Sequence, residues 1–346
     1  MTSYELMIKA NHYLIKGGKL SNGQISTIVN QFISDRSSAE QAQKYDIGVR
    51  FPNSSDENGR GMYPIFYIPP YNNGKKLKTV LGQTPKTQIL SANMYELEIL
   101  RLLHIFAPEN AEVKNMVTET LQRLKTTCFG YTDDGVGECF DASLVVLRFL
   151  AAAAQKETEW IKSRIDNYNC HYGDKKRPWF SKWYYWLCLS ELPFAIAYPE
   201  IEKYKDEMLH RLTCKSYVMN SENDKQIHPV CLCILRNVLS KYPEYAYIKE
   251  RQPHINAKDG RLYFDMRVME NSYRFFANRD CEYFPCHKGV GDFNCLFCYC
   301  PLYLKENCPG KPAYIEKDGK KIKDCTDCAF PHQPENYDAV IRILGG

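Results

Sequence analysis

The residues with the clearest chemistry are cysteines, and eight of the chain's fifteen lie between Cys281 and Cys328. Two of the spacings are CxxC pairs, Cys295/Cys298 and Cys325/Cys328. A CxxC turn brings two sulfurs close enough to bind one metal ion, as it does in structural zinc sites. The pattern therefore predicts a metal-binding module with the candidate ligands Cys281, Cys286, His287, Cys295, Cys298, Cys300, Cys308, Cys325, Cys328 and His332.

The number of donors favours two closed metal sites. Eight cysteines and two histidines give ten donors, and two tetrahedral zinc ions need about eight of them. We expect each CxxC pair to anchor one site, with the sets completed by Cys286, Cys300, Cys308 and either His287 or His332. The spacing leaves the pairing open. Saturated sites have no position for water, so we expect structural zinc, with an iron–sulfur cluster as the alternative.

The same segment resembles the cysteine-rich small domain family. The resemblance is carried by four stretches, Tyr283-Phe-Pro-Cys-His-Lys-Gly289, Phe293-Asn-Cys-Leu-Phe-Cys-Tyr-Cys-Pro-Leu-Tyr303, Lys323-Asp-Cys-Thr-Asp-Cys328 and Pro331-His-Gln-Pro-Glu-Asn-Tyr-Asp338. It covers roughly residues 279 to 343 and implies metal binding without implying a reaction. We therefore expect a cysteine-rich domain over residues 279–346.

Composition indicates a cytoplasmic protein. The chain of 346 residues is long enough to bury a large core without disulfides. Its first residues lack the basic and apolar pattern of a secretory signal, and no apolar run approaches the roughly 18 residues that a membrane-spanning helix needs. In a reducing compartment clustered thiols bind metal rather than pair, although a secreted disulfide-rich domain is the alternative. The net charge of +4, with lysines among acidic residues, does not require a nucleic acid or membrane partner.

Residues 1–275 are predicted to form a mainly α domain of helical hairpins. Cys128, Cys170 and Cys214 each precede a tyrosine and are 42 and 44 residues apart. Pro108, Pro199 and Pro243 are each followed by glutamate, a pair that suits the first turn of a helix. The period of about 43 residues favours a solenoid or a closed α/α toroid.

Two kinds of helix alternate within this period. Helices that are apolar on all sides should be buried, and amphipathic ones should cover them. The apolar segments are 94–106, 138–154, 179–192 and 228–239, and the amphipathic segments are 110–124, 156–168 and 200–212. Residues 3–33 are a further candidate hairpin. We also expect a β-hairpin or ordered loop near 51–85, a turn and short strand within 254–268, and a hinge at 274–280.

The helical array resembles the α/α toroids of prenyltransferases and terpene cyclases. The resemblance lies in the glycine-rich loop 130–137 and the apolar helix that follows it, but the DxDD acid and the Gln-Trp repeats of cyclases are missing. It implies a cavity for an apolar, isoprenoid-like substrate and a rim of polar loops. Candidate catalytic residues are Asp133, Asp134, Glu138, Asp141 and His228, and candidate substrate-binding residues are His171, Lys175, Lys176, Arg177, Trp183 and Trp186.

Each of these residues also has an ordinary structural interpretation. Asp133 and Asp134 suit a solvated turn, and Glu138 and Asp141 suit a helix N-terminus. The basic run suits a solvated loop, the histidine a cap, and the tryptophans a core. We expect an enzyme of the transferase, lyase or isomerase type that binds a small apolar molecule. The alternatives are a repeat scaffold that binds a protein or peptide and a nucleic-acid-binding zinc protein.

Overall fold

The computed structural model describes residues 1–42, 66–70, 76–131, 137–172, 178–213, 216–256, 259–266, 273–278, 281–290 and 292–345. The chain divides into two compact units, Met1–Met266 and Arg267–Gly346. The division therefore lies slightly before the position expected from sequence. The described chain is mainly helical, as predicted, and its small strands form two separate two-stranded sheets.

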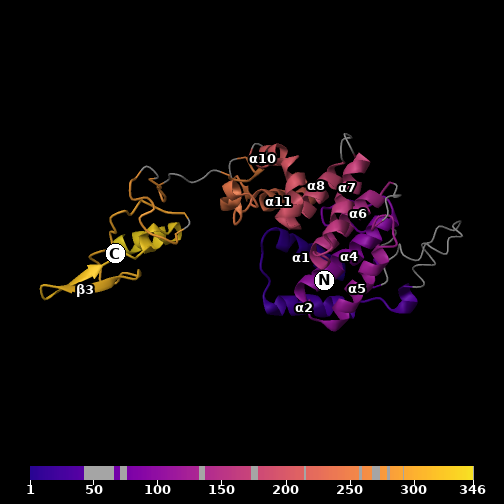
Figure 1. Ribbon diagram of the computed structural model, residues 1–346, viewed down its shortest axis with the longest axis horizontal. Coiled ribbons are helices and arrows are strands. Elements are labelled where there is room, and N and C mark those ends of the chain that lie inside the picture. Colours follow the sequence, from indigo (N-terminus) through magenta and orange to yellow (C-terminus); the bar gives the residue numbers. More distant parts are fainter. Residues whose placement is uncertain are drawn as a thin grey trace. The chain divides into compact units, whose positions relative to one another are not determined.

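The first unit is built from helices (Figure 1), and side chains cap the N-termini of four of them, α1, α2, α5 and α11. Thr2, Ser21 and Ser221 each form a capping box at the start of a helix, and the Asn110 side chain accepts a hydrogen bond from the Val113 N–H. The helices are α1 (Ser3–Ile15), α2 (Asn22–Ser34), α4 (Gln88–Phe106), α5 (Ala111–Leu124), α6 (Cys139–Ala153), α7 (Thr158–Tyr172), α8 (Trp179–Glu191), α9 (Phe194–Glu202), α10 (Lys205–Thr213) and α11 (Glu222–Leu239).

Burial follows the two helix types that the sequence indicates. Helices α4, α6 and α8 bury most of their residues, whereas α5 and α7 bury one face. Helix α4 packs on α6, α6 on α8, and α8 on α11, while α1 contacts both α4 and α11. Helices α5, α7 and α10 pack on α4, α6 and α11 respectively. The toroid or solenoid repeat itself stays a prediction.

Two details of the predicted helices are wrong. The expected helix 200–212 is two helices, α9 and α10, with a break at Lys203 and Tyr204. Pro199 lies inside α9 instead of opening a helix. The helix begins earlier, after Pro193, because the apolar residues from Phe194 onward continue the buried surface. Pro243 does open a helix, the 3₁₀ helix η2 (Pro243–Ile248).

A network of buried charges links the interior helices. Arg148 of α6 is fully buried, and its Nη1 lies 2.8 Å from both carboxylate oxygens of Glu98 on α4. Its Nε and Nη2 lie 2.9 and 2.8 Å from Glu191 on α8, which also pairs with Arg101 at 2.8 Å. Arg101 in turn donates to the Asn11 side chain of α1 at 3.2 Å. Balanced charges rather than an apolar cavity therefore occupy this part of the interior.

The structure agrees only in part with the predictions for the two non-helical segments of the first unit. Strands β1 (His254–Ile255) and β2 (Leu262–Tyr263) pair in antiparallel fashion, which confirms the short strand expected after the turn. The described residues 66–70 and 76–85 hold no strand, and the rest of the expected hairpin, 51–65 and 71–75, lies outside the described residues. Of the two alternatives for 51–85, the hairpin finds no support among the described residues, whereas their non-helical, partly buried course agrees with an ordered loop.

The second unit contains little regular structure. Strands β3 (Ala313–Lys317) and β4 (Lys320–Asp324) form a hairpin whose turn residues, Asp318 and Gly319, have φ angles of 53° and 72°. Positive φ at both positions is typical of a two-residue type I′ turn. The other elements are short, namely η3 (Phe330–His332), η4 (Pro334–Asn336) and α12 (Tyr337–Gly345).

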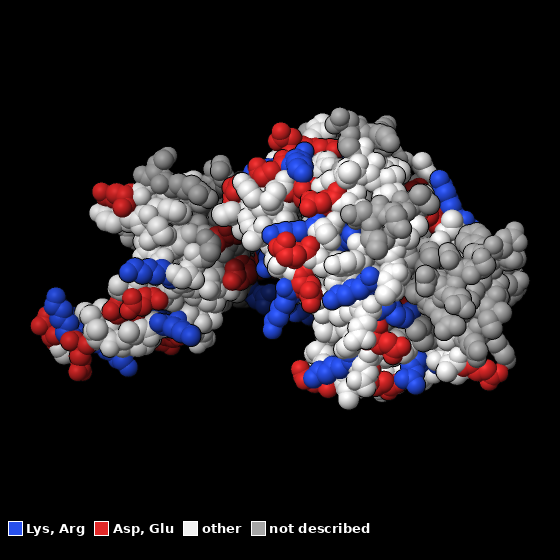
Figure 2. Space-filling view, turned by 45° about the vertical axis from the view of Figure 1, so that its right-hand side comes forward, with Lys and Arg blue, Asp and Glu red and all other residues white. Residues whose placement is uncertain are grey.

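This second unit has a small core, in which Phe293, Leu302 and Val340 are the most buried apolar residues together with the thiol of Cys328. A core of that size rarely stabilises a domain without disulfides or metal. Among the described residues no helix is long and apolar enough to cross a lipid bilayer. On the face that Figure 2 shows, basic and acidic side chains are interspersed rather than gathered into one patch.

Candidate metal centre

The first CxxC pair lies with the two cysteines that precede it. Cys281, Cys286, Cys295 and Cys298 line one pocket of about 290 Å³, whose other lining residues include the rings of Phe284 and Phe293. Burial raises the pKa of Cys286, and the neighbouring sulfurs of Cys298, Cys295 and Cys281 raise it further. The N–H of Cys298 donates to the Cys295 carbonyl at 3.1 Å, which closes the CxxC turn. We call these four residues the first thiol set.

The second CxxC pair lies with Cys300 and Cys308. Burial raises the pKa of Cys325, and the Cys300, Cys328 and Cys308 sulfurs add to that rise. Burial likewise raises the pKa of Cys300, with contributions from the sulfurs of Cys308 and Cys328. A Cβ placed on Gly310 would lie 2.7 Å from Sγ of Cys328 and 3.4 Å from Sγ of Cys308. These four cysteines are the second thiol set.

The neighbours of each thiol bear on the pairing that the spacing leaves open. The sets follow each other along the chain instead of interleaving, with the boundary between Cys298 and Cys300. All eight cysteines are free thiols. Four thiols are the donors of a structural zinc site and also those of an iron–sulfur cluster. The donor chemistry of the eight thiols therefore fits two metal sites.

The two histidines lie beside the first thiol set. Sγ of Cys286 is 3.3 Å from Nδ1 of His287, and the His287 and His332 ring centroids are 4.7 Å apart. His332 is buried, and its Nδ1 lies 2.9 Å from the backbone oxygen of Asn294. Burial lowers the pKa of His332, which favours the neutral imidazole.

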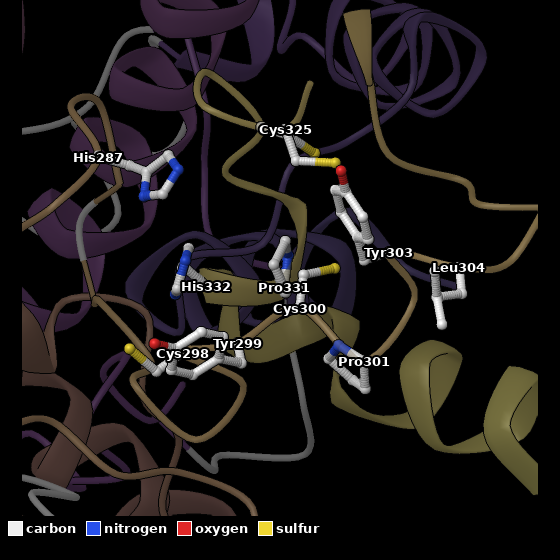
Figure 3. A pocket seen from close by; sticks show the side chains of 11 residues that line it. His287, Cys298, Tyr299, Cys300, Pro301, Tyr303, Leu304, Cys325, Pro331 and His332 are labelled. Atoms are coloured by element: carbon white, nitrogen blue, oxygen red, sulfur yellow. The ribbon is translucent and has the colours of Figure 1, made fainter. Parts of the chain in front are cut away.

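A second, larger pocket lies between the two sets. It has a volume of about 560 Å³ and is lined by residues of both sets and by both histidines. Figure 3 shows the two imidazoles along one side of this pocket, with Cys300, Cys325 and Tyr303 across from them. Tyr299, another lining residue, is 95% exposed, so the pocket is open to solvent at that edge.

Five of the predicted active-site residues lie outside the described residues, so the structure places none of them. They are Asp133, Asp134, Lys175, Lys176 and Arg177. The carboxylate of Glu138 accepts hydrogen bonds from the N–H groups of Lys86 and Thr87 and from the Thr87 hydroxyl. Glu138 thus holds the segment that leads into α4, which is a structural role.

The Asp141 carboxyl lies in an environment that perturbs its pKa. It lies in the first turn of α6 near Ser181 and Gln83, and its Oδ1 is buried with no hydrogen-bond partner among the described residues. Burial raises its pKa from 3.8 to about 6, the nearby Glu138 carboxylate adds to the rise, and Ser181 opposes it. A carboxyl with such a pKa is half protonated near pH 6 and suits general acid chemistry.

The other predicted catalytic and substrate-binding residues that the structure describes pack against aromatic rings. His171 stacks on Phe140 with ring centroids 3.3 Å apart, and His228 lies 4.9 Å from the Tyr217 ring. Trp183 and Trp186 are almost fully buried and contact each other edge to face at 5.0 Å. Both tryptophans therefore belong to the packed core, in agreement with their structural interpretation.

Sequence reasoning missed the buried ions Glu98 and Arg148 and their partly buried partner Glu191. Their signal was present, because Glu98 and Arg148 are charges within the otherwise apolar runs 97–103 and 142–151. Such charges on an all-buried helix must find buried partners. It also missed Gly310, whose close approach to two thiols has no sequence signature beyond its place after Cys308.

Comparison with known proteins identifies the second unit. Residues 272–345 match the zf-like family model of the cysteine-rich small domain. The predicted resemblance is thereby confirmed for this part of the chain. The chain is also 42% identical over 69 residues to Uncharacterized protein MJ0836 of Methanocaldococcus jannaschii. That match covers 20% of this chain and 56% of the relative, so it spans about half of the relative's length. No solved structure matches this chain.

Proposed function

We propose that the cysteine-rich small domain binds two zinc ions, one in each thiol set, and that these ions hold the domain together. The observation that carries the proposal is the grouping of eight thiols into two sets of four. Closed four-thiol sites are typical of structural zinc, which supplies folding free energy and does not turn over substrate. The small apolar core of this unit supports the same role.

The two histidines near the thiol sets favour zinc over an iron–sulfur cluster. Imidazoles interleaved with cysteines, such as His287 and His332, are more common in zinc modules than in four-thiolate clusters. The thiols also fit a reducing compartment, and we propose a cytoplasmic location on that ground.

Metal analysis of anaerobically purified protein, with its absorption spectrum, tests the metal identity. We expect zinc and no absorption in the visible region. A brown protein that contains iron and sulfide would contradict zinc and would indicate a redox centre.

A second candidate function concerns the helical unit and rests on Asp141. We propose that this unit is an enzyme that acts on an apolar, isoprenoid-like substrate, with the Asp141 carboxyl as the acid. Its buried and unpartnered oxygen and its raised pKa support this role. The basic run 175–177 supplies candidate partners for a diphosphate group.

Farnesyl diphosphate is a suitable probe for this second candidate. Binding at 100 times Kd should stabilise the protein by about 2.7 kcal/mol and raise its Tm. Asp141→Asn should still bind the probe but should not convert it. An unchanged Tm and no heat of binding in calorimetry would contradict the assignment.

A further inference from the structure

Three donor atoms converge at the edge of the first thiol set, one from its member Cys286 and two from histidines. Sγ of Cys286, a ring nitrogen of His287 and a ring nitrogen of His332 lie within 4.8 Å of one another. Thiolate and imidazole are the donors that zinc and related divalent ions prefer. The spacing is short enough for one ion to contact all three after small movements.

His332 is held in the way that metal-binding histidines are held. A backbone carbonyl accepts only from an N–H, so the 2.9 Å contact with Asn294 places the proton on Nδ1 of His332. The lone pair of Nε2 is then free to bind a cation. The N–H of Asn294 also donates to the His332 carbonyl at 2.8 Å, and the ring stacks on Phe293 with centroids 4.5 Å apart. These contacts fix the direction of the imidazole before any ion binds.

His287 supplies the second imidazole. Its Nδ1 faces the Cys286 sulfur, whereas its Nε2 is buried and has no hydrogen-bond partner among the residues that the structure describes. A buried polar atom without a partner is costly, and such atoms often mark a place that another species occupies. The ring is tilted by 37° to that of His332, so the two imidazoles do not stack flat.

The adjoining pocket provides space for a fourth ligand. His287 and His332 line the pocket of about 560 Å³ between the thiol sets, and their rings are visible at its side in Figure 3. Three protein donors leave one position of a tetrahedral ion open, which is the arrangement that distinguishes reactive zinc from structural zinc. The exposed Tyr299 at the edge leaves that position within reach of solvent.

We propose that Cys286, His287 and His332 bind a third divalent metal ion whose open position faces this pocket and holds an exchangeable water or small anion. The Cys286 thiolate then bridges the third ion to the ion of the first thiol set, because its sulfur has lone pairs for both. This inference rests on the proposed function, since it assumes that the first thiol set is filled. It adds a site that can exchange ligands to a domain otherwise closed to them.

Cobalt substitution of the full-length chain tests the third site. Protein stripped of metal is refilled with excess Co²⁺ under anaerobic conditions, desalted, and analysed for metal per chain. We expect three ions in the wild type and in the control His210→Ala, which changes an exposed histidine of α10. We expect two ions in His287→Ala and in His332→Ala. Azide should shift the visible cobalt bands of the wild type but not those of the two variants.

The outcomes separate the third site from the two thiol sites. Two ions in the wild type and in both variants would overturn the third site and leave the proposed function standing. Three ions in all proteins would place the third ion elsewhere and would also overturn it. Fewer than two ions in the wild type would contradict the proposed function itself. If a variant fails to fold, the response of the wild-type cobalt spectrum to azide still tests the third site. Saturated thiol sites do not respond to azide, so an unchanged wild-type spectrum would refute the open position.

Discussion

Substituting Gly310 should weaken one metal site without removing any ligand. An alanine Cβ at this position would lie 2.7 Å from Sγ of Cys328 and 3.4 Å from both Sγ of Cys308 and Cβ of Phe330. Two of these neighbours, the sulfurs of Cys328 and Cys308, belong to the second thiol set. Gly310→Ala therefore pushes directly on the geometry of that set, whereas no cysteine of the first set is among the atoms closest to the new methyl group.

The size of the effect follows from the distances. The methyl group and the Cys328 sulfur must separate by about 1 Å to reach an ordinary contact, because non-bonded heavy atoms are most stable at about 3.5 to 4.0 Å. Zinc–sulfur distances in protein sites stay within about 0.2 Å of their usual value. The set cannot absorb the full movement, so we expect affinity at this site to fall about 10- to 1000-fold, or about 1.4 to 4 kcal/mol.

Competition with a chromophoric zinc chelator measures this affinity for each ion. We expect Gly310→Ala to lose one ion readily and to keep the other with wild-type affinity. Gly345→Ala is the matched control, because a Cβ there meets nothing within 4 Å. If Gly310→Ala binds both ions as tightly as the wild type, the placement of the Cys308 loop against Cys328 is wrong.

Three further predictions concern the helical unit. Arg148→Met leaves the buried Glu98 without its Arg148 partner and removes one of the two arginines that pair with Glu191. Urea unfolding should therefore show a loss of about 3 to 5 kcal/mol, and a loss under 1 kcal/mol would refute the network. The pKa of Asp141 is raised from 3.8 unfolded to about 6 folded, so wild-type stability should fall as pH rises from about 4 to 6. Unfolding curves of Asp141→Asn should lack that fall, which reaches about 3 kcal/mol at 1.36 kcal/mol per pKa unit, and parallel pH profiles would contradict the shift. Glu138→Ala removes the acceptor for Lys86 and Thr87 and should cost about 0.5 to 2 kcal/mol in the same assay, with an unchanged midpoint as the contrary result.

Much of the helical unit can be predicted from sequence because burial leaves a pattern. The runs around Leu144 and Trp183 are apolar on all sides, and they form the buried helices α6 and α8. The break between α9 and α10 has no comparable signal, since residues 200–212 keep a helical period across it. Prolines were a poor guide, because Pro199 and Pro229 are both inside helices. Tertiary packing decides whether a helix breaks at such positions, and local residue spacing does not predict that packing.

The candidate metal ligands could be predicted as a group but not as two sets. CxxC spacing places Cys295 near Cys298 whatever the fold, because the turn is local. Whether Cys286 joins Cys298 or Cys325 depends on long-range folding that spacing does not encode. The predicted substrate-binding tryptophans show the opposite difficulty, because Trp183 and Trp186 are of a residue type that lines cavities and also fills cores. Their burial places them in the core.

Cadmium-113 NMR of cysteine variants tests the grouping of the thiols most directly. With two equivalents of ¹¹³Cd the wild type should give two resonances typical of sulfur-only sites. Cys281→Ser and Cys295→Ser should abolish or shift the same resonance, and Cys300→Ser and Cys325→Ser should affect the other. If Cys295→Ser and Cys325→Ser instead act on one resonance, the eight thiols do not divide into the two sets described, and the two-site account is wrong.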